Sequence, residues 1–150
     1  MTRRFCLLIA VAVAAGTASA AAATPVVPTF TQGRIAKTVP SLAYVPARLA
    51  IGWHYRRWTH QGGVLRIWFA NKAGREITFV AAPLTGNCRT GMEKSFQQAG
   101  VKTYWSHTAN EQQAWRCVDG VRLVAATSLR PDQFADVGLG RIAASGHRIR

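Results

Sequence analysis

The chain has 150 residues, three cysteines and a formal net charge of +13 at pH 7. This length allows one ordinary domain and little more. The 19 basic residues against 6 acidic ones favour contact with anionic material. Because the basic residues are scattered and no run of five like charges occurs, a basic arm for nucleic acid is not expected.

The first twenty residues have the pattern of a secretory signal peptide. Arg3 and Arg4 precede the apolar run 5–15, and small residues lead to Ala-Ser-Ala at positions 18–20. The apolar run is short for a permanent membrane span, although an uncleaved anchor stays an alternative. We therefore predict cleavage after residue 20, by general or twin-arginine export, and a periplasmic or extracellular location. The cleaved chain has a net charge of +11.

Residues 21–46 contain four prolines and predict an extended leader. Proline fixes φ and removes a backbone donor, so a proline-rich segment behaves as a semi-rigid tether. The domain proper is expected to span residues 47–145, with 146–150 as a basic tail.

Residues 53–127 alternate between apolar and polar side chains, which predicts about six antiparallel strands. An Asp119-Gly120 pair between two such runs indicates a tight hairpin, so Asp119 is interpreted as a turn residue. Ser128 to Asp132 resembles a helix start, and a C-terminal helical segment should follow. The segments that carry the strand pattern are 53–58, 64–71, 76–82, 92–98, 101–106, 112–118 and 121–127.

Removal of the signal leaves two cysteines, Cys88 and Cys117. An oxidising compartment favours a disulfide between them. It would close a loop of about thirty residues and contribute about 3–4 kcal/mol in the chain-entropy model. The alternative makes Cys117 a nucleophile with His107 as its base. No cysteine or histidine spacing indicates a metal site.

The order of elements resembles uncharacterised exported domains of bacterial envelope proteins, which occur beyond anti-sigma-type membrane segments and are similar in style to lipoprotein-carrier half-barrels. The resemblance covers about residues 44–145. It rests on Tyr44-Val45-Pro46, the hairpin LRIWFANKAGREITFVAA, the strand pair WRCVDGVRLV and a final Ser-Leu-x-Pro segment. It implies a curved antiparallel sheet with helix cover, and no catalytic residues. The predicted fold is thus α+β, with a curved sheet, a C-terminal helical segment and one disulfide.

Aromatic and arginine side chains share the central strands, and they suggest a binding face for an anionic envelope polymer, a lipid or a protein. Tryptophan in a small sheet also serves core packing, which is the competing interpretation. The residues predicted to bind are Trp58, Arg66, Trp68, Tyr104 and His107.

Catalytic motifs for hydrolysis or phosphate binding do not occur in the sequence. A polar cluster around His107, with Ser106, Thr108 and Glu111, supports a second hypothesis of a small secreted hydrolase that uses His107 with Cys117 or Glu111. A structural or inhibitory module is a third. We favour a non-enzymatic exported protein that binds an anionic or amphipathic partner and uses no cofactor.

Overall fold

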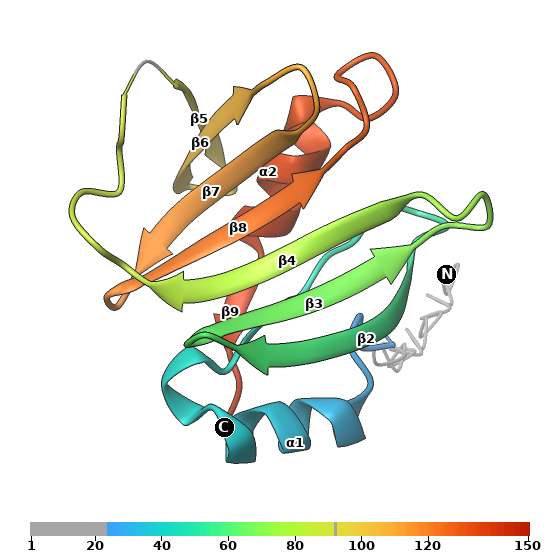
Figure 1. Cartoon of the computed structure of the whole chain (residues 1–150), viewed down its shortest axis with the longest axis vertical. Coiled ribbons are helices and arrows are strands. Elements are labelled where there is room, and N and C mark those ends of the chain that lie inside the picture. Colours follow the sequence, from blue (N-terminus) through green and yellow to red (C-terminus); the bar gives the residue numbers. More distant parts are fainter. Residues whose placement is uncertain (1–23, 92) are drawn as a thin grey trace, which may run out of the picture.

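The computed structural model describes residues 24–91 and 93–150. The predicted signal peptide, residues 1–20, lies outside this part of the chain. The main element is an open antiparallel sheet with the strand order β2-β3-β4-β8-β7-β6-β5 (Figure 1). The curved antiparallel sheet is confirmed, with seven strands in place of about six. They are β2 (His54–Gln61), β3 (Val64–Ala70), β4 (Glu76–Pro83), β5 (Lys94–Gln98), β6 (Val101–His107), β7 (Gln112–Val118) and β8 (Val121–Thr127).

Two-residue turns connect three of the strand pairs. Asp119 has φ +49° and Gly120 has φ +74°, so both central residues of the β7–β8 turn lie in the left-handed region. This backbone conformation matches the twist of the flanking strands, which is why Asp-Gly is favoured in such hairpins. The interpretation of Asp119 as a turn residue is confirmed.

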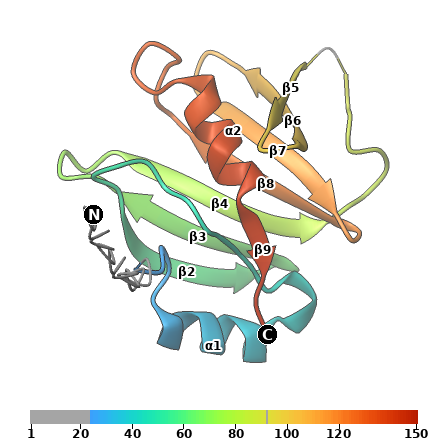
Figure 2. The ribbon, with the colours of Figure 1, turned by 180° about the vertical axis from the view of Figure 1, so that it is seen from behind.

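The inner face of the sheet, which we define as the face covered by α2 (Asp136–Ala144), holds the hydrophobic core. Figure 2 shows α2 in front of the sheet, where it packs on β6, β7 and β8. Ile67 of β3 pairs with Phe79 of β4, and Phe79 pairs with Ala125 of β8. All three side chains are fully buried. The predicted C-terminal helical segment is thus confirmed, and its role is to cover one half of this face.

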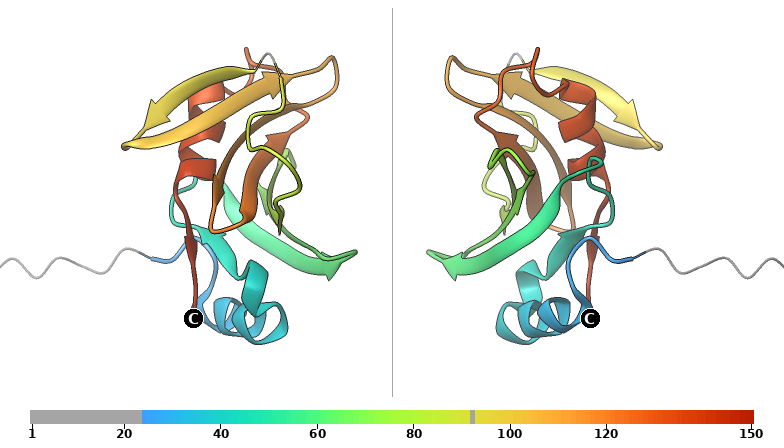
Figure 3. Two further views of the ribbon diagram at one scale, coloured as in Figure 1. Left: turned by 90° about the vertical axis from the view of Figure 1, so that its left-hand side faces the viewer. Right: turned by 90° about the vertical axis from the view of Figure 1, so that its right-hand side faces the viewer.

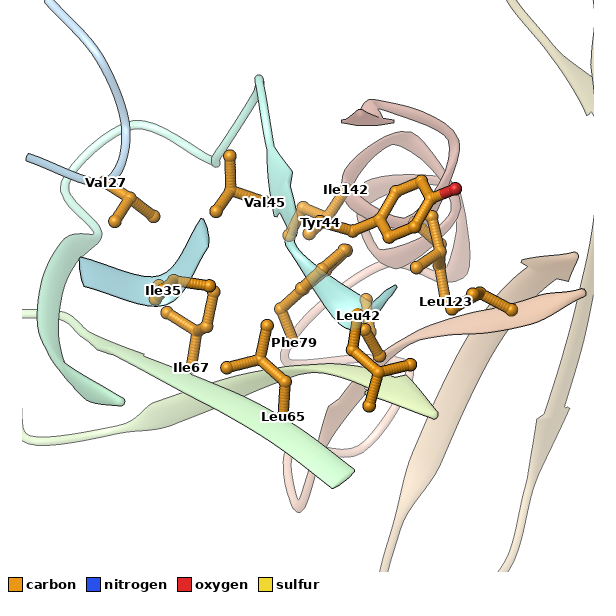
Figure 4. Close-up of a cluster of buried hydrophobic side chains, with 14 of the residues drawn as sticks. Val27, Ile35, Leu42, Tyr44, Val45, Leu65, Ile67, Phe79, Leu123 and Ile142 are labelled. Atoms are coloured by element: carbon orange, nitrogen blue, oxygen red, sulfur yellow. The ribbon is translucent and has the colours of Figure 1, made fainter. Parts of the chain in front are cut away.

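The described part of the predicted leader, residues 24–46, is not an extended tether. It contains α1 (Thr29–Thr38), a short 3₁₀ helix η1 (Pro40–Leu42) and β1 (Tyr44–Pro46). Pro28 directly precedes α1 and Pro40 follows it, so these prolines bound the helix and do not interrupt it. Ile35 of α1 is fully buried and points toward Ile67 of β3 (Figure 4). Tertiary packing therefore makes this segment part of the domain.

The predicted basic tail, residues 146–150, also belongs to the fold. Residues Gly146–Arg148 form β9, which pairs antiparallel with β1 in a separate two-stranded sheet. A Cβ atom at position 146 would lie 2.7 Å from Leu123 Cδ1, so the chain needs a glycine where β9 crosses the core. The position of this glycine explains how a polar C-terminal segment reaches a buried partner.

The predicted disulfide between Cys88 and Cys117 is present, with a Cα–Cα distance of 5.8 Å. It ties the segment 84–91, which we call the strap, to β7. Figure 3 shows the strap and α2 on opposite sides of the sheet. Trp115 lies beneath the strap with 1% of its surface exposed, and its indole N–H donates to the carbonyl of Cys88 at 2.8 Å. Cys117 therefore has no free thiol to act as a nucleophile.

A structural disulfide is consistent with export, because such bonds persist in oxidising compartments. No helix in the described ranges is long and apolar enough to cross a membrane.

Truncation of Ile35 should show that α1 belongs to the folding unit. We expect Ile35→Ala to lower the free energy of unfolding by about 2–5 kcal/mol, because it removes fully buried methyl and methylene groups. Phe30→Ala on the same helix is the control. Phe30 is 78% exposed, so its truncation should change stability by less than about 0.5 kcal/mol. Urea unfolding checks both, and equal small effects would return this segment to the status of a leader.

Removal of the disulfide should destabilise the domain. The variant Cys88→Ala/Cys117→Ala should lose about 3–4 kcal/mol of unfolding free energy. Without the bridge, the segment 88–117 has more conformations in the unfolded chain. A dithiol reductant should lower the stability of the unmodified protein and leave that of the variant unchanged. A reductant effect of the same size on both proteins would argue against the bridge as its source.

Candidate functional site

The outer face of the sheet, opposite to α2, carries arginine and aromatic side chains on β2 and β3. Arg57 pairs with Trp68, and its guanidinium carbon lies 4.5 Å from the centroid of the indole. Arg66 is on the same face, one alternation from Trp68. A register shift between Tyr55 and Arg57 turns Arg57 outward. Such a bulge inserts a residue into one strand, so simple alternation along β2 does not reveal it.

The two central strands, β4 and β8, present short side chains on this face. Val80 pairs with Val124, and Thr78 pairs with Ala126. None of them is longer than valine, whereas the neighbouring strands carry tryptophan and arginine. The middle of the outer face is therefore lower than its flanks.

The far flank of the outer face is formed by β7 and the end of β8. The guanidinium carbon of Arg122 lies 4.7 Å from the indole centroid of Trp115. The ring of Tyr104 also stacks on this indole, with the two ring centroids 5.9 Å apart. The Nε atom of Arg122 is buried and has no hydrogen-bond partner. This burial lowers the pKa of the Arg122 guanidinium below its ordinary value. A positive charge is thus held partly out of water beside the strap.

Arg57, Arg66 and Arg122 form no salt bridge with a described carboxylate, although the charge of Glu93 acts on Arg122. The described residues form two salt bridges, Lys94–Asp136 and Arg130–Asp132, and neither involves Arg57, Arg66 or Arg122. Arginine offers several N–H donors in a fixed planar fork, which suits carboxylate and phosphate groups.

The sheet brings only some of the predicted binding residues together. Arg66, Trp68 and Tyr104 lie on the outer face. Trp58 pairs with Ile67 and packs against the core from the inner face. His107 also follows the inner-face register at the end of β6, where its ring stacks on Trp105 at 5.1 Å. Period-two alternation along β2 could not assign the face of Trp58, because the bulge between Tyr55 and Arg57 changes the phase.

A hollow of about 520 Å³ opens at one end of the outer face. Thr127 Oγ1 donates to the carbonyl of Glu76 at 2.8 Å and so fixes the start of β4 beside the end of β8. The amide of Thr108 donates to the carbonyl of Glu111 at 2.7 Å, which closes the turn between β6 and β7. The lining residues are Arg66, Trp68, Glu76, Thr78, Val80, Asn110, Glu111, Ala126, Thr127 and Ser128.

A second hollow, of about 480 Å³, lies beside His107. Its buried Gln112 donates to the carbonyls of Leu129 and Phe134, and its side-chain oxygen accepts from Trp105. Gln112 is therefore engaged in structural contacts. Among the described residues, no hydrogen bond joins the His107 imidazole to a hydroxyl or a carboxylate, so the structure does not display an activated nucleophile there.

A partly buried polar cluster holds β1 and β9 to the β7–β8 hairpin. The hydroxyl of Tyr44 donates to Asp119 Oδ2 at 3.2 Å, and Arg116 donates to the carbonyl of Gly146. Tyr44 is 2% exposed. Burial, together with the hydrogen bond to Asp119, raises the pKa of the Tyr44 phenol above its ordinary value of 10.0. The cluster serves the fold, and it gives Asp119 a second role beyond the turn.

Comparison with models of known protein families found no match, and comparison with curated proteins found no significant similarity. No group of three or more His, Cys, Asp and Glu side chains in residues 24–91 and 93–150 is arranged to hold a metal ion.

The raised pKa of Tyr44 predicts a loss of stability at alkaline pH. The folded state keeps the phenol protonated above the pKa of the unfolded chain, so its contribution is complete below about pH 10 and falls as pH rises further. We expect the unfolding free energy of Tyr44→Phe to fall less between about pH 9 and pH 11 than that of the unmodified protein. Tyr104→Phe is the control, and an equal flattening by both variants would exclude Tyr44 as the source. Denaturant unfolding across this range provides the measurement.

Proposed function

We propose that the chain is an exported, non-enzymatic protein of the bacterial envelope that binds an anionic partner through the outer face of its sheet. The observation that carries the proposal is the pair Arg57 and Arg66 beside Trp68, which lies on the face opposite to α2 and forms no salt bridge with a described residue. Arginine binds carboxylate and phosphate groups and also stacks on aromatic rings. Arginines without salt-bridge partners beside an aromatic ring are therefore a suitable anion-binding surface.

The overall charge supports the same partner. All six acidic residues and all basic residues except Arg3 and Arg4 lie in the described part of the chain, which gives it a net charge of +11. A surplus of this size attracts polyanions before contact, and the attraction weakens as salt screens it. The arginines then supply short-range contacts, since a guanidinium can bind a carboxylate or a phosphate with two parallel hydrogen bonds.

The hydrolase alternative receives less support. Its Cys117 nucleophile is consumed by the disulfide. Its His107 imidazole stacks on Trp105 and has no hydrogen-bonded hydroxyl or carboxylate partner among the described residues. The disulfide also favours an oxidising location, which agrees with the predicted signal peptide.

A matched pair of charge variants tests the proposal. Arg57→Gln/Arg66→Gln removes two charges from the outer face, while Arg34→Gln/Arg150→Gln removes two exposed charges from α1 and the C-terminal end. Binding to immobilised dextran sulfate and to vesicles of phosphatidylglycerol and phosphatidylcholine is measured at rising salt. We expect the outer-face variant to bind one of these probes at least about tenfold more weakly, a difference of about 1.4 kcal/mol.

The control variant has the same net charge and should lose much less affinity. An equal loss in the two variants would mean that total charge, and not the outer face, determines binding. Retained binding in both would remove the arginines from the proposal.

A further inference from the structure

The hollow at the end of the outer face has a chemistry that a simple anion-binding surface does not need. Arg66 and Trp68 line it from β3, while Glu76 and Glu111 line it from β4 and from the β6–β7 turn. Both glutamates are exposed. A bare polyanion would be repelled by them, so their position beside Arg66 indicates a ligand that carries hydrogen-bond donors as well as a negative group.

Trp68 is an aromatic residue that lines the hollow. Arg57 of β2 lies over its indole at 4.5 Å from the centroid. The hollow itself is lined from β3, β4, β8 and the loops at their ends, and by no residue of β2. Trp68 is half-buried, and an indole offers a flat apolar surface to a ring of similar size.

Hydrogen bonds fix the main chain around the hollow. Thr127 donates to the carbonyl of Glu76, and the amide of Thr108 and its hydroxyl both donate to the carbonyl of Glu111. The same hydroxyl accepts from the amide of Asn110 at 3.4 Å. The two exposed glutamate side chains therefore project from a fixed backbone. A few polar groups beside apolar side chains are the usual composition of a ligand site.

These features fit a sugar ring better than a membrane. Sugar rings have apolar C–H faces for the indole and hydroxyl groups that donate to carboxylates. The anionic headgroups of a bilayer would instead meet the two exposed glutamates that line the hollow.

We propose that this hollow binds a ring of an acidic glycan, with the ring against Trp68, its carboxylate or phosphate on Arg66 and its hydroxyls on Glu76 and Glu111. The inference rests on the proposed function and names the class of its anionic partner. The glycan oxyanion can be a uronic acid carboxylate or a sugar phosphate, since arginine accommodates both.

The test uses the full oxidised chain and calorimetric titration. The probes are tetragalacturonic acid, a phosphorylated mannose oligosaccharide, acyclic polyphosphate and phosphatidylglycerol vesicles. We expect binding of at least one acidic oligosaccharide, and the arm that binds identifies the oxyanion. Both Trp68→Leu and Glu76→Gln/Glu111→Gln should weaken that binding by at least about tenfold.

Polyphosphate distinguishes the two proposals, because it has no ring and no hydroxyl-bearing carbons. Trp68→Leu should leave its binding unchanged, and Glu76→Gln/Glu111→Gln should strengthen it by removing two repulsive charges. Asp132→Asn, compared with Glu111→Gln alone, controls for the loss of one carboxylate. Because both glutamates are exposed, the double variant should fold even if Trp68→Leu does not.

The glycan inference is overturned if the double glutamate variant binds the oligosaccharides as tightly as, or more tightly than, the unmodified protein. It is also overturned if vesicles bind and oligosaccharides do not. If polyphosphate binding still depends on Arg57 and Arg66 in these cases, the outer face is a general polyanion surface and the proposed function stands.

Discussion

The one-sided core formed by β3, β4 and β8 is the constraint on which the other features depend. Antiparallel register places Ile67 beside Phe79 and Phe79 beside Ala125, so apolar side chains form a continuous inner surface. Apolar surface is stable only when it is removed from contact with water, and here α2, α1 and the β1–β9 pair cover it. Because these elements all lie on one side, the opposite side of the central strands is available for ligands.

The disulfide divides the outer face into two functionally different parts. Where the strap crosses β7, Trp115 is buried and the neighbouring Arg122 is partly withdrawn from water. Over β2, β3 and β4 there is no such cover, and Arg57, Arg66 and Trp68 are exposed or half-buried. The same pairing of arginine with tryptophan is therefore covered at one flank and accessible at the other, where we propose binding. Covalent closure of the strap makes this difference permanent under oxidising conditions.

The proposed site combines a long-range electrostatic attraction for anions with a short-range repulsion of them by two glutamates. In this proposal the large positive charge of the molecule attracts an anionic chain, while Glu76 and Glu111 weaken the binding of ligands that offer only negative charge. Specificity often requires such a repulsive element in addition to attractive contacts. A glycan satisfies both groups because its rings carry hydroxyl donors and an oxyanion on one scaffold.

Local pattern was sufficient to predict the alternating strands, the Asp119-Gly120 turn and the helix after Ser128, because each depends on neighbours in the sequence. The Cys88–Cys117 pair could also be predicted, since removal of the predicted signal peptide leaves two cysteines, and two cysteines allow one intramolecular disulfide. Only the tertiary structure showed that α1 is packed in the core, that a bulge turns Arg57 outward, and that Trp58 and Trp68 lie on opposite faces. These features depend on contacts between distant segments and on strand register, and a single strand's alternation contains neither.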